Sequence, residues 1–168
     1  MRFFTPEWHG GDITEAESDA VLAAYQRHVA EILPQLHATV RVLARELALH
    51  DARVRRVVVD RPGGEVRVEL RCGDRQAGYY DLDLVYLDAV VDARDATELA
   101  AAARDPRSEL LYDEVDVIDG AGEAAYLHRM LFWPYRDVEI MFRALSLRLA
   151  PRADRSVPLF ADRYVEAG

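Results

Sequence analysis

The chain has no lysine, a single cysteine, and no apolar stretch long enough to span a bilayer. All 21 of its basic residues are arginine. The single thiol, Cys72, cannot form an internal disulfide or supply a cysteine-rich zinc site, which is typical of proteins in a reducing compartment. A membrane-spanning helix needs about 20 consecutive apolar residues, and the first residues are interrupted too early for a signal peptide. We therefore expect a cytoplasmic protein with no membrane partner.

The chain also lacks the positive charge that nucleic-acid binding requires. Its 30 acidic residues outnumber the arginines and give a net charge of −9. Phosphate backbones are bound by basic surfaces, so we expect no nucleic-acid partner. The negative charge is concentrated in residues 76–119, which hold 12 acidic residues against 3 Arg. This imbalance favours a cationic protein partner.

Length and hydropathy patterning predict one globular domain over residues 1–168. The chain is 51% hydrophobic, which is enough to bury a core at this length. Residues 1–50 have helical periodicity, and residues 51–150 have the period of two that is typical of strands. The tail over 151–168 keeps several apolar residues, so we expect it to lie against the body of the protein.

Two helical segments are expected before the sheet. Thr14 with Glu17 forms a capping box, which predicts a helix from about Glu15 to Leu33. Pro34 suits the first turn of a second helix. One kinked helix and two separate helices are both consistent with this pattern. The second segment carries an apolar stripe of Leu36, Val40, Leu43 and Leu47.

The rest of the pattern predicts strands joined by short turns. Asp60–Gly64 is a turn in which Pro62 sets φ and one of the two glycines supplies the positive-φ position. Apolar and polar residues alternate without interruption in the strand that follows, so one of its faces is buried and the other is exposed to solvent. Six strands are expected, through Val57 and Val59 and then over residues 65–72, 79–87, 109–118, 125–133 and 138–149.

The expected fold class is α+β. Two N-terminal helices pack on a roughly six-stranded, mainly antiparallel meander sheet with one short inserted helix. Asp95 with Glu98 is the expected cap of that helix. The last strand changes phase after Phe142, which predicts a bulge near Arg143. Cys72 is in phase with the apolar side of its strand, so a buried, inert thiol is favoured over a nucleophile.

Two short segments carry a resemblance to known proteins. The start Phe4-Thr5-Pro6-Glu7-Trp8, and Leu49-His50-Asp51-Ala52 leading into the sheet, resemble a family of uncharacterised bacterial domains of unknown function. Members look like short N-terminal helices followed by an antiparallel sheet, and the resemblance implies no catalytic residue. The small acidic α+β domain is also loosely similar to bacterial toxin-immunity proteins, which implies a protein partner.

The acidic segment contains the main candidate binding residues. Asp81 and Asp83 share one face of an expected strand, and Tyr112, Glu114 and Asp116 share one face of the next. If these strands are neighbours, the four carboxylates lie close together. A solvated outer face, a surface for a cationic protein and a Mg²⁺ or Ca²⁺ site are the three explanations. Flat rows of carboxylates suit a metal poorly, and Tyr112 favours a contact surface.

No catalytic assembly is evident in the sequence. The pair His50 and Asp51 is the most suggestive, because a carboxylate orients an imidazole, yet the same residues are common in turns. His128 is in phase with core residues of its strand, which favours a packed imidazole. We expect no cofactor and no metal. The leading hypothesis is a non-enzymatic protein-binding domain, which by that resemblance would be immunity-like, and the alternative is a small hydrolase using His50 and Asp51.

Overall fold

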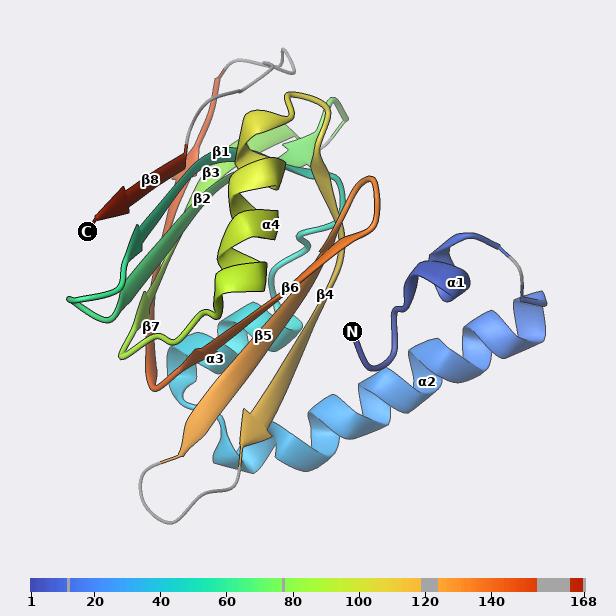
Figure 1. Ribbon diagram of the computed structural model, residues 1–168. Coiled ribbons are helices and arrows are strands. Elements are labelled where there is room, and N and C mark those ends of the chain that lie inside the picture. The colour runs from blue at the N-terminus through green and yellow to red at the C-terminus, as the bar shows by residue number, and fades with distance from the viewer. Residues whose placement is uncertain (12, 77, 119–123, 154–163, 168) are drawn as a thin grey trace.

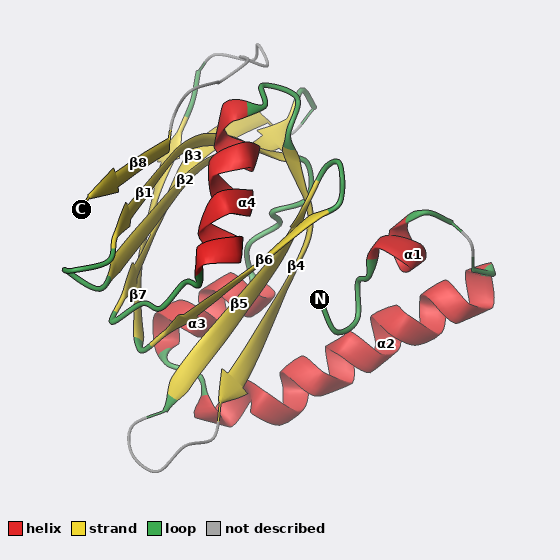
Figure 2. Ribbon diagram, in the orientation of Figure 1, coloured by secondary structure: helices red, strands yellow, loops and turns green. Residues whose placement is uncertain are grey.

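The computed structural model describes the whole chain except residues 12, 77, 119–123, 154–163 and 168 (Figure 1). The fold is α+β, as expected from the sequence, with helices at the N-terminus, then a mainly antiparallel sheet with one inserted helix (Figure 2). The helical elements are α1 (Pro6–His9), α2 (Glu15–Ile32), the 3₁₀ turn η1 (Leu33–Gln35), α3 (Ala38–Arg45) and α4 (Ala93–Arg104). The strands are β1 (Ala52–Asp60), β2 (Glu65–Asp74), β3 (Gly78–Leu87), β4 (Glu109–Ile118), β5 (Ala125–Phe132), β6 (Arg136–Phe142), β7 (Ala144–Pro151) and β8 (Tyr164–Ala167).

The sheet has the order β6-β5-β4-β1-β2-β3-β7, with β8 alongside β1, and is not the six-stranded meander that the pattern predicts. The expected last strand is two strands, because after Arg143 the chain leaves β5 and pairs with β3 at the opposite edge of the sheet. The Arg143 N–H donates to the Leu87 carbonyl at this corner. The phase change in the sequence is therefore a change of partner strand and not a bulge.

The sheet curls because β4 follows β1 for only a short distance. β4 pairs with β1 at Ala52 and Arg53 alone, and β8 takes the same edge of β1 in parallel from Val57 to Asp60. Helix α4 packs against β1, β6 and β8, and it lies between the two halves of the curved sheet in Figure 1. Asp92 caps α4 by accepting the Asp95 N–H, so the expected cap at Asp95 is wrong by three residues.

The N-terminal helices are separate. The capping box of Thr14 and Glu17 is present, and α2 ends in the 3₁₀ turn that contains Pro34. α3 begins only at Ala38, one turn later than Pro34 indicates, and buries Val40 and Leu43 of the expected stripe. The short helix α1 was not expected from the sequence. It places Trp8 against β4, where its ring contacts Tyr112 edge-on at 4.7 Å.

The expected buried thiol is confirmed. Cys72 on β2 has no exposed surface, and burial raises its pKa to about 12. We expect a thiol reagent to label the native protein at least about a thousandfold more slowly than the protein in urea, because a central strand opens only in near-global unfolding. Mass spectrometry at timed intervals measures both rates. Rapid labelling without denaturant would contradict this placement.

Candidate functional site

The two rows of acidic residues do not form one surface. β3, with Asp81 and Asp83, is separated from β4, with Glu114 and Asp116, by β2 and β1. The two strands are therefore not neighbours, and the four carboxylates do not form a shared cluster. Each acidic residue has its own surroundings.

Asp81 is enclosed by arginines on the outer face of β3. Its carboxylate lies 2.5 Å from Arg71 Nε, and within 3.2 and 3.5 Å of Arg55 and Arg152. The side chain is 9% exposed. Such a carboxylate is an internal counter-ion of the sheet and is not available to a partner. Asp83, two residues further along, makes no ion pair with the described residues.

Glu114 anchors the N-terminal segment to β4. Its two oxygens accept the backbone N–H groups of Arg2, Phe3 and Phe4 at 2.7–2.8 Å, and the side chain is 1% exposed. Asp116, two residues further along β4 on the same face, contacts His28 and Arg129. Burial opposes its ionisation, but the Val117 N–H and Arg129 outweigh burial, so the pKa of Asp116 lies below its usual range. Both carboxylates are therefore engaged in contacts within the folded chain.

His50 and Asp51 are brought together by a tight turn before β1. The Ala52 N–H donates to the Leu49 carbonyl, and Asp51 has a φ of 62° in the left-handed region. His50 Nε2 lies 3.4 Å from the Asp51 carboxylate, and Nδ1 donates to the Leu111 carbonyl at 2.5 Å. The Nδ1–H bond to Leu111 leaves the basic lone pair of the neutral ring on Nε2, beside the Asp51 carboxylate, and both side chains are more than half exposed.

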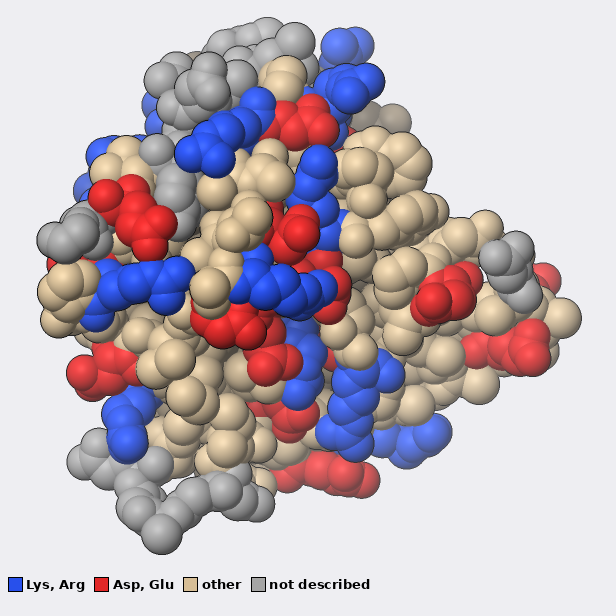
Figure 3. All heavy atoms as spheres, viewed as in Figure 1, with Lys and Arg blue, Asp and Glu red and all other residues tan. Residues whose placement is uncertain are grey.

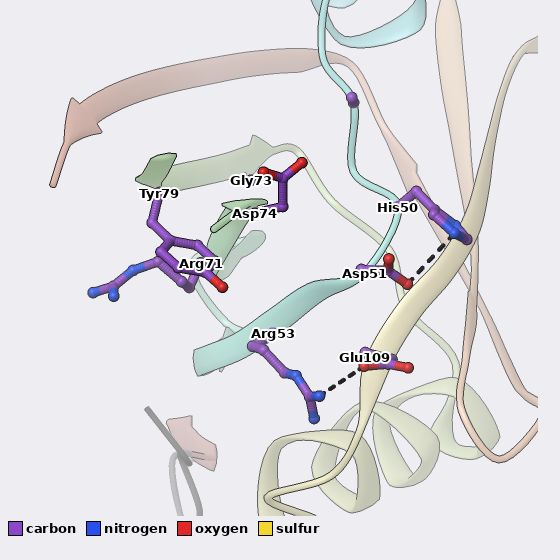
Figure 4. Close-up of a pocket in the computed structure, with 9 residues that line it drawn as sticks. His50, Asp51, Arg53, Arg71, Gly73, Asp74, Tyr79 and Glu109 are labelled. Atoms are coloured by element: carbon purple, nitrogen blue, oxygen red, sulfur yellow. Dashed lines mark ion pairs between the residues drawn. The ribbon is translucent and has the colours of Figure 1, made fainter. Parts of the chain in front are cut away.

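The turn borders a polar pocket of about 480 Å³ (Figure 4). Arg53 on one wall is paired with Glu109 at 2.8 Å, and Arg71 on another is paired with Asp81. Figure 4 shows His50 and Asp51 opposite the Gly73–Asp74 end of β2. The charges of this pocket are largely balanced within the chain.

A second cluster, which sequence reasoning missed, crosses the interior of the curved sheet. Tyr86 on β3 lies 2.7 Å from His128 Nδ1, and His128 Nε2 lies 3.1 Å from Asp113 Oδ2 on β4. Burial, and then the nearby Asp113 carboxylate, raise the pKa of Tyr86 well above its usual value, so the hydroxyl stays protonated. The protonated Tyr86 hydroxyl and the Asp113 carboxylate thus contact the two ring nitrogens of His128 from opposite sides. The interpretation of His128 as a packed imidazole is confirmed, since it has no exposed surface.

This hydrogen-bonded chain ends in a second pocket of about 220 Å³. Asp113 lines it, and its side chain is 18% exposed. Tyr25 of α2 also lines it, and the Tyr25 hydroxyl oxygen accepts the Val115 N–H at 3.0 Å. Tyr112 and His50 complete the rim, with their rings 5.2 Å apart. Tyr112 is thus the one residue of the expected acidic face that meets the alternative site at His50.

The sequence did contain a signal for this cluster. Asp113 is in phase with Val115 and Val117, which face the interior, whereas Glu114 and Asp116 have the opposite phase. An acidic residue on the apolar side of a strand is unusual because burial of a carboxylate without partners is costly. The phase of Asp113 and that of His128 together indicated a polar interaction in the core.

Comparison with known proteins gives no identification. No protein-family model and no curated protein matches the chain. The resemblance to uncharacterised bacterial domains therefore stays a prediction. Among the described residues, no helix is long and apolar enough to cross a membrane, and no group of three or more His, Cys, Asp or Glu side chains is placed to hold a metal ion.

The two aspartates of β3 provide a matched pair of substitutions. Asp81→Asn removes the charge that three arginines enclose, and we expect it to lower the free energy of unfolding by about 3 kcal/mol or more. Asp83→Asn, on the same face of the same strand, should change it by less than about 1 kcal/mol. Urea denaturation followed by circular dichroism measures both. Equal effects would show that Asp81 is no more internal than Asp83.

Proposed function

We propose that the chain is a non-catalytic protein-binding domain whose partner is cationic. The observation that supports this most directly is a row of aromatic rings on the surface beside the Asp113 pocket. The turn between β5 and β6 presents Trp133 and Tyr135, which are 41% and 40% exposed. Large exposed aromatic side chains are enriched in protein interfaces and provide much of their binding energy.

The rings form a continuous strip. Trp133 and Tyr135 are 5.4 Å apart, His9 of α1 lies 5.7 Å from both Tyr135 and Tyr112, and Tyr112 leads to His50. We call these five residues the aromatic strip. It spans α1, β4 and the β5–β6 turn, which are brought together because Glu114 holds the N-terminal segment on β4.

Two exposed acidic side chains lie beside the strip and support a cationic partner. Exposed Glu7 on α1 and Asp51 beside His50 make no ion pair with a described arginine. Figure 3 shows mostly uncharged surface around α1, with acidic side chains next to it and at the start of α2, and basic side chains further along α2. With a net charge of −9, the long-range field attracts basic proteins. This surface replaces the acidic sheet face in the proposal, since Asp81, Glu114 and Asp116 are engaged inside the fold.

Toxin immunity is one role that fits a small acidic binding domain of this kind, and the loose similarity to immunity proteins supports it. The buried thiol of Cys72 fits a cytoplasmic location. A hydrolase at His50 and Asp51 is the second candidate. It is favoured by their closeness at the 480 Å³ pocket and by the Nδ1 hydrogen bond to Leu111, which leaves Nε2 as the basic nitrogen. Asp51, however, lies at Nε2 itself and so does not orient the ring from the opposite side.

The strip can be tested with a double substitution and a matched control. We expect Trp133→Ala with Tyr135→Ala to weaken capture of a basic partner from host lysate by at least about tenfold, because both side chains lose buried contact area. Val90→Ala with Leu149→Ala, at exposed apolar positions elsewhere, should change it by less than about twofold. Affinity capture with mass spectrometry identifies the partner, and its purified form is then used for binding kinetics.

The charge is tested on the same partner. Raising the ionic strength from low to physiological should slow association much more than it speeds dissociation. Equal capture by the strip variant and the wild-type protein, or an acidic partner whose association does not depend on salt, would count against the proposal.

A further inference from the structure

Asp113, which is partly exposed, differs from the buried acidic residues in what surrounds it. Asp81 faces three arginines, Asp95 is paired with Arg94, and Glu114 accepts three backbone N–H groups. Asp113 Oδ2 lies 3.1 Å from His128 Nε2, and no described arginine lies within ion-pair distance of the carboxylate. Asp113 therefore has neither an arginine nor a backbone N–H among its described partners, and no described donor reaches Oδ1.

The pocket at Asp113 has walls suited to a cation. Phe4, Tyr25 and Tyr112 line it, with the Phe4 ring 4.9 Å from that of Tyr25 and 5.3 Å from that of Tyr112. Aromatic faces attract cations, and they do so more strongly where water is displaced. The Tyr25 oxygen keeps a second lone pair beyond the one that accepts the Val115 N–H. Leu43 of α3, and Leu47 just after that helix, supply apolar surface for an alkyl chain.

The geometry of Asp113 distinguishes between the two common cations of proteins. A guanidinium binds best to both oxygens of a carboxylate in parallel, and His128 already occupies one acceptor position of Oδ2. A primary ammonium is a compact charge that needs only one strong acceptor at a time. The volume of about 220 Å³ equals that of roughly seven water molecules, which is enough for a butylammonium group.

We infer that this pocket receives a primary ammonium group, presented by a lysine side chain of the cationic partner. This inference rests on the proposed function, and it assigns a specific contact to it, because the pocket opens beside Tyr112 and His50 of the aromatic strip. A second copy of the chain cannot supply the group from a side chain, since the sequence contains no lysine.

The inference is tested with three small probes of the same backbone. The probes are Nα-acetyl-lysine methylamide, its arginine counterpart and its norleucine counterpart, which is uncharged. In NMR titrations we expect the lysine compound to bind in the millimolar range with shifts at Tyr25, Tyr112 and Asp113, as is usual for ligands of this size. The arginine compound should bind several-fold more weakly, and the norleucine compound should produce no saturable shift.

Two variants separate charge from shape. Asp113→Asn keeps an oxygen for the His128 hydrogen bond and should weaken binding of the lysine compound at least tenfold. Ala44→Leu narrows the pocket without touching the carboxylate and should also weaken it. Asp83→Asn, which removes a carboxylate far from the pocket, should leave the binding unchanged. An unchanged dispersion of the amide spectrum shows that each variant is folded.

The outcomes distinguish the inference from the proposed function. Equal shifts with the lysine and norleucine compounds, or undiminished binding to Asp113→Asn, would overturn the ammonium site even if a basic partner is captured through the aromatic strip. Saturable binding of the lysine compound that Asp113→Asn abolishes would support the site, even if the strip variant captures its partners normally and the proposed function fails.

Discussion

The separation of β4 from β1 after Leu110 is the constraint on which the rest of the structure depends. Beyond that point the edge of β4 needs new hydrogen-bond partners, because unpaired backbone groups are costly when buried. The Tyr25 hydroxyl meets this need at Val115 and so fixes α2 beside the sheet. The freed edge of β1 is covered by β8, and α4 fills the opening between the two halves.

The same separation creates the candidate site. Because the sheet curls, Tyr86 on β3 and His128 on β5 face each other across the interior, although three strands lie between theirs in the sheet order. The outward Glu114 draws the N-terminal segment onto β4, and this contact brings Phe4 to the pocket and α1 to the surface. One face of β4 thus supplies Asp113 to the hydrogen-bonded chain in the interior. The other face supplies Glu114, which holds the N-terminal segment that contributes to the aromatic strip.

Periodicity predicted most of the elements but not how they pair. Alternation shows which residues of a strand share a face, and β2 and β4 therefore agree with the sequence analysis to within two residues. Alternation contains no information on which strands are neighbours. The sequence is therefore compatible with β3 and β4 side by side, and it predicts one strand where the structure has β6 and β7. The change of edge at Arg143 depends on contacts with Leu87, far away in the sequence, which no local pattern encodes.

The acidic residues show why a count of charges could not locate the site. Asp81, Glu114 and Asp116 contribute to the negative segment as much as Asp113 does, yet arginines or backbone N–H groups satisfy each of the three. A carboxylate with no arginine among its partners keeps its attraction for a cation, because the interior screens charge less than water does. The only cationic side chains of the chain, apart from histidine, are arginines, and no described arginine reaches Asp113, so an ammonium group for it would come from another molecule. The distinction between a structural and a binding carboxylate therefore lies in the hydrogen bonds around each oxygen, and these exist only once the sheet has curled.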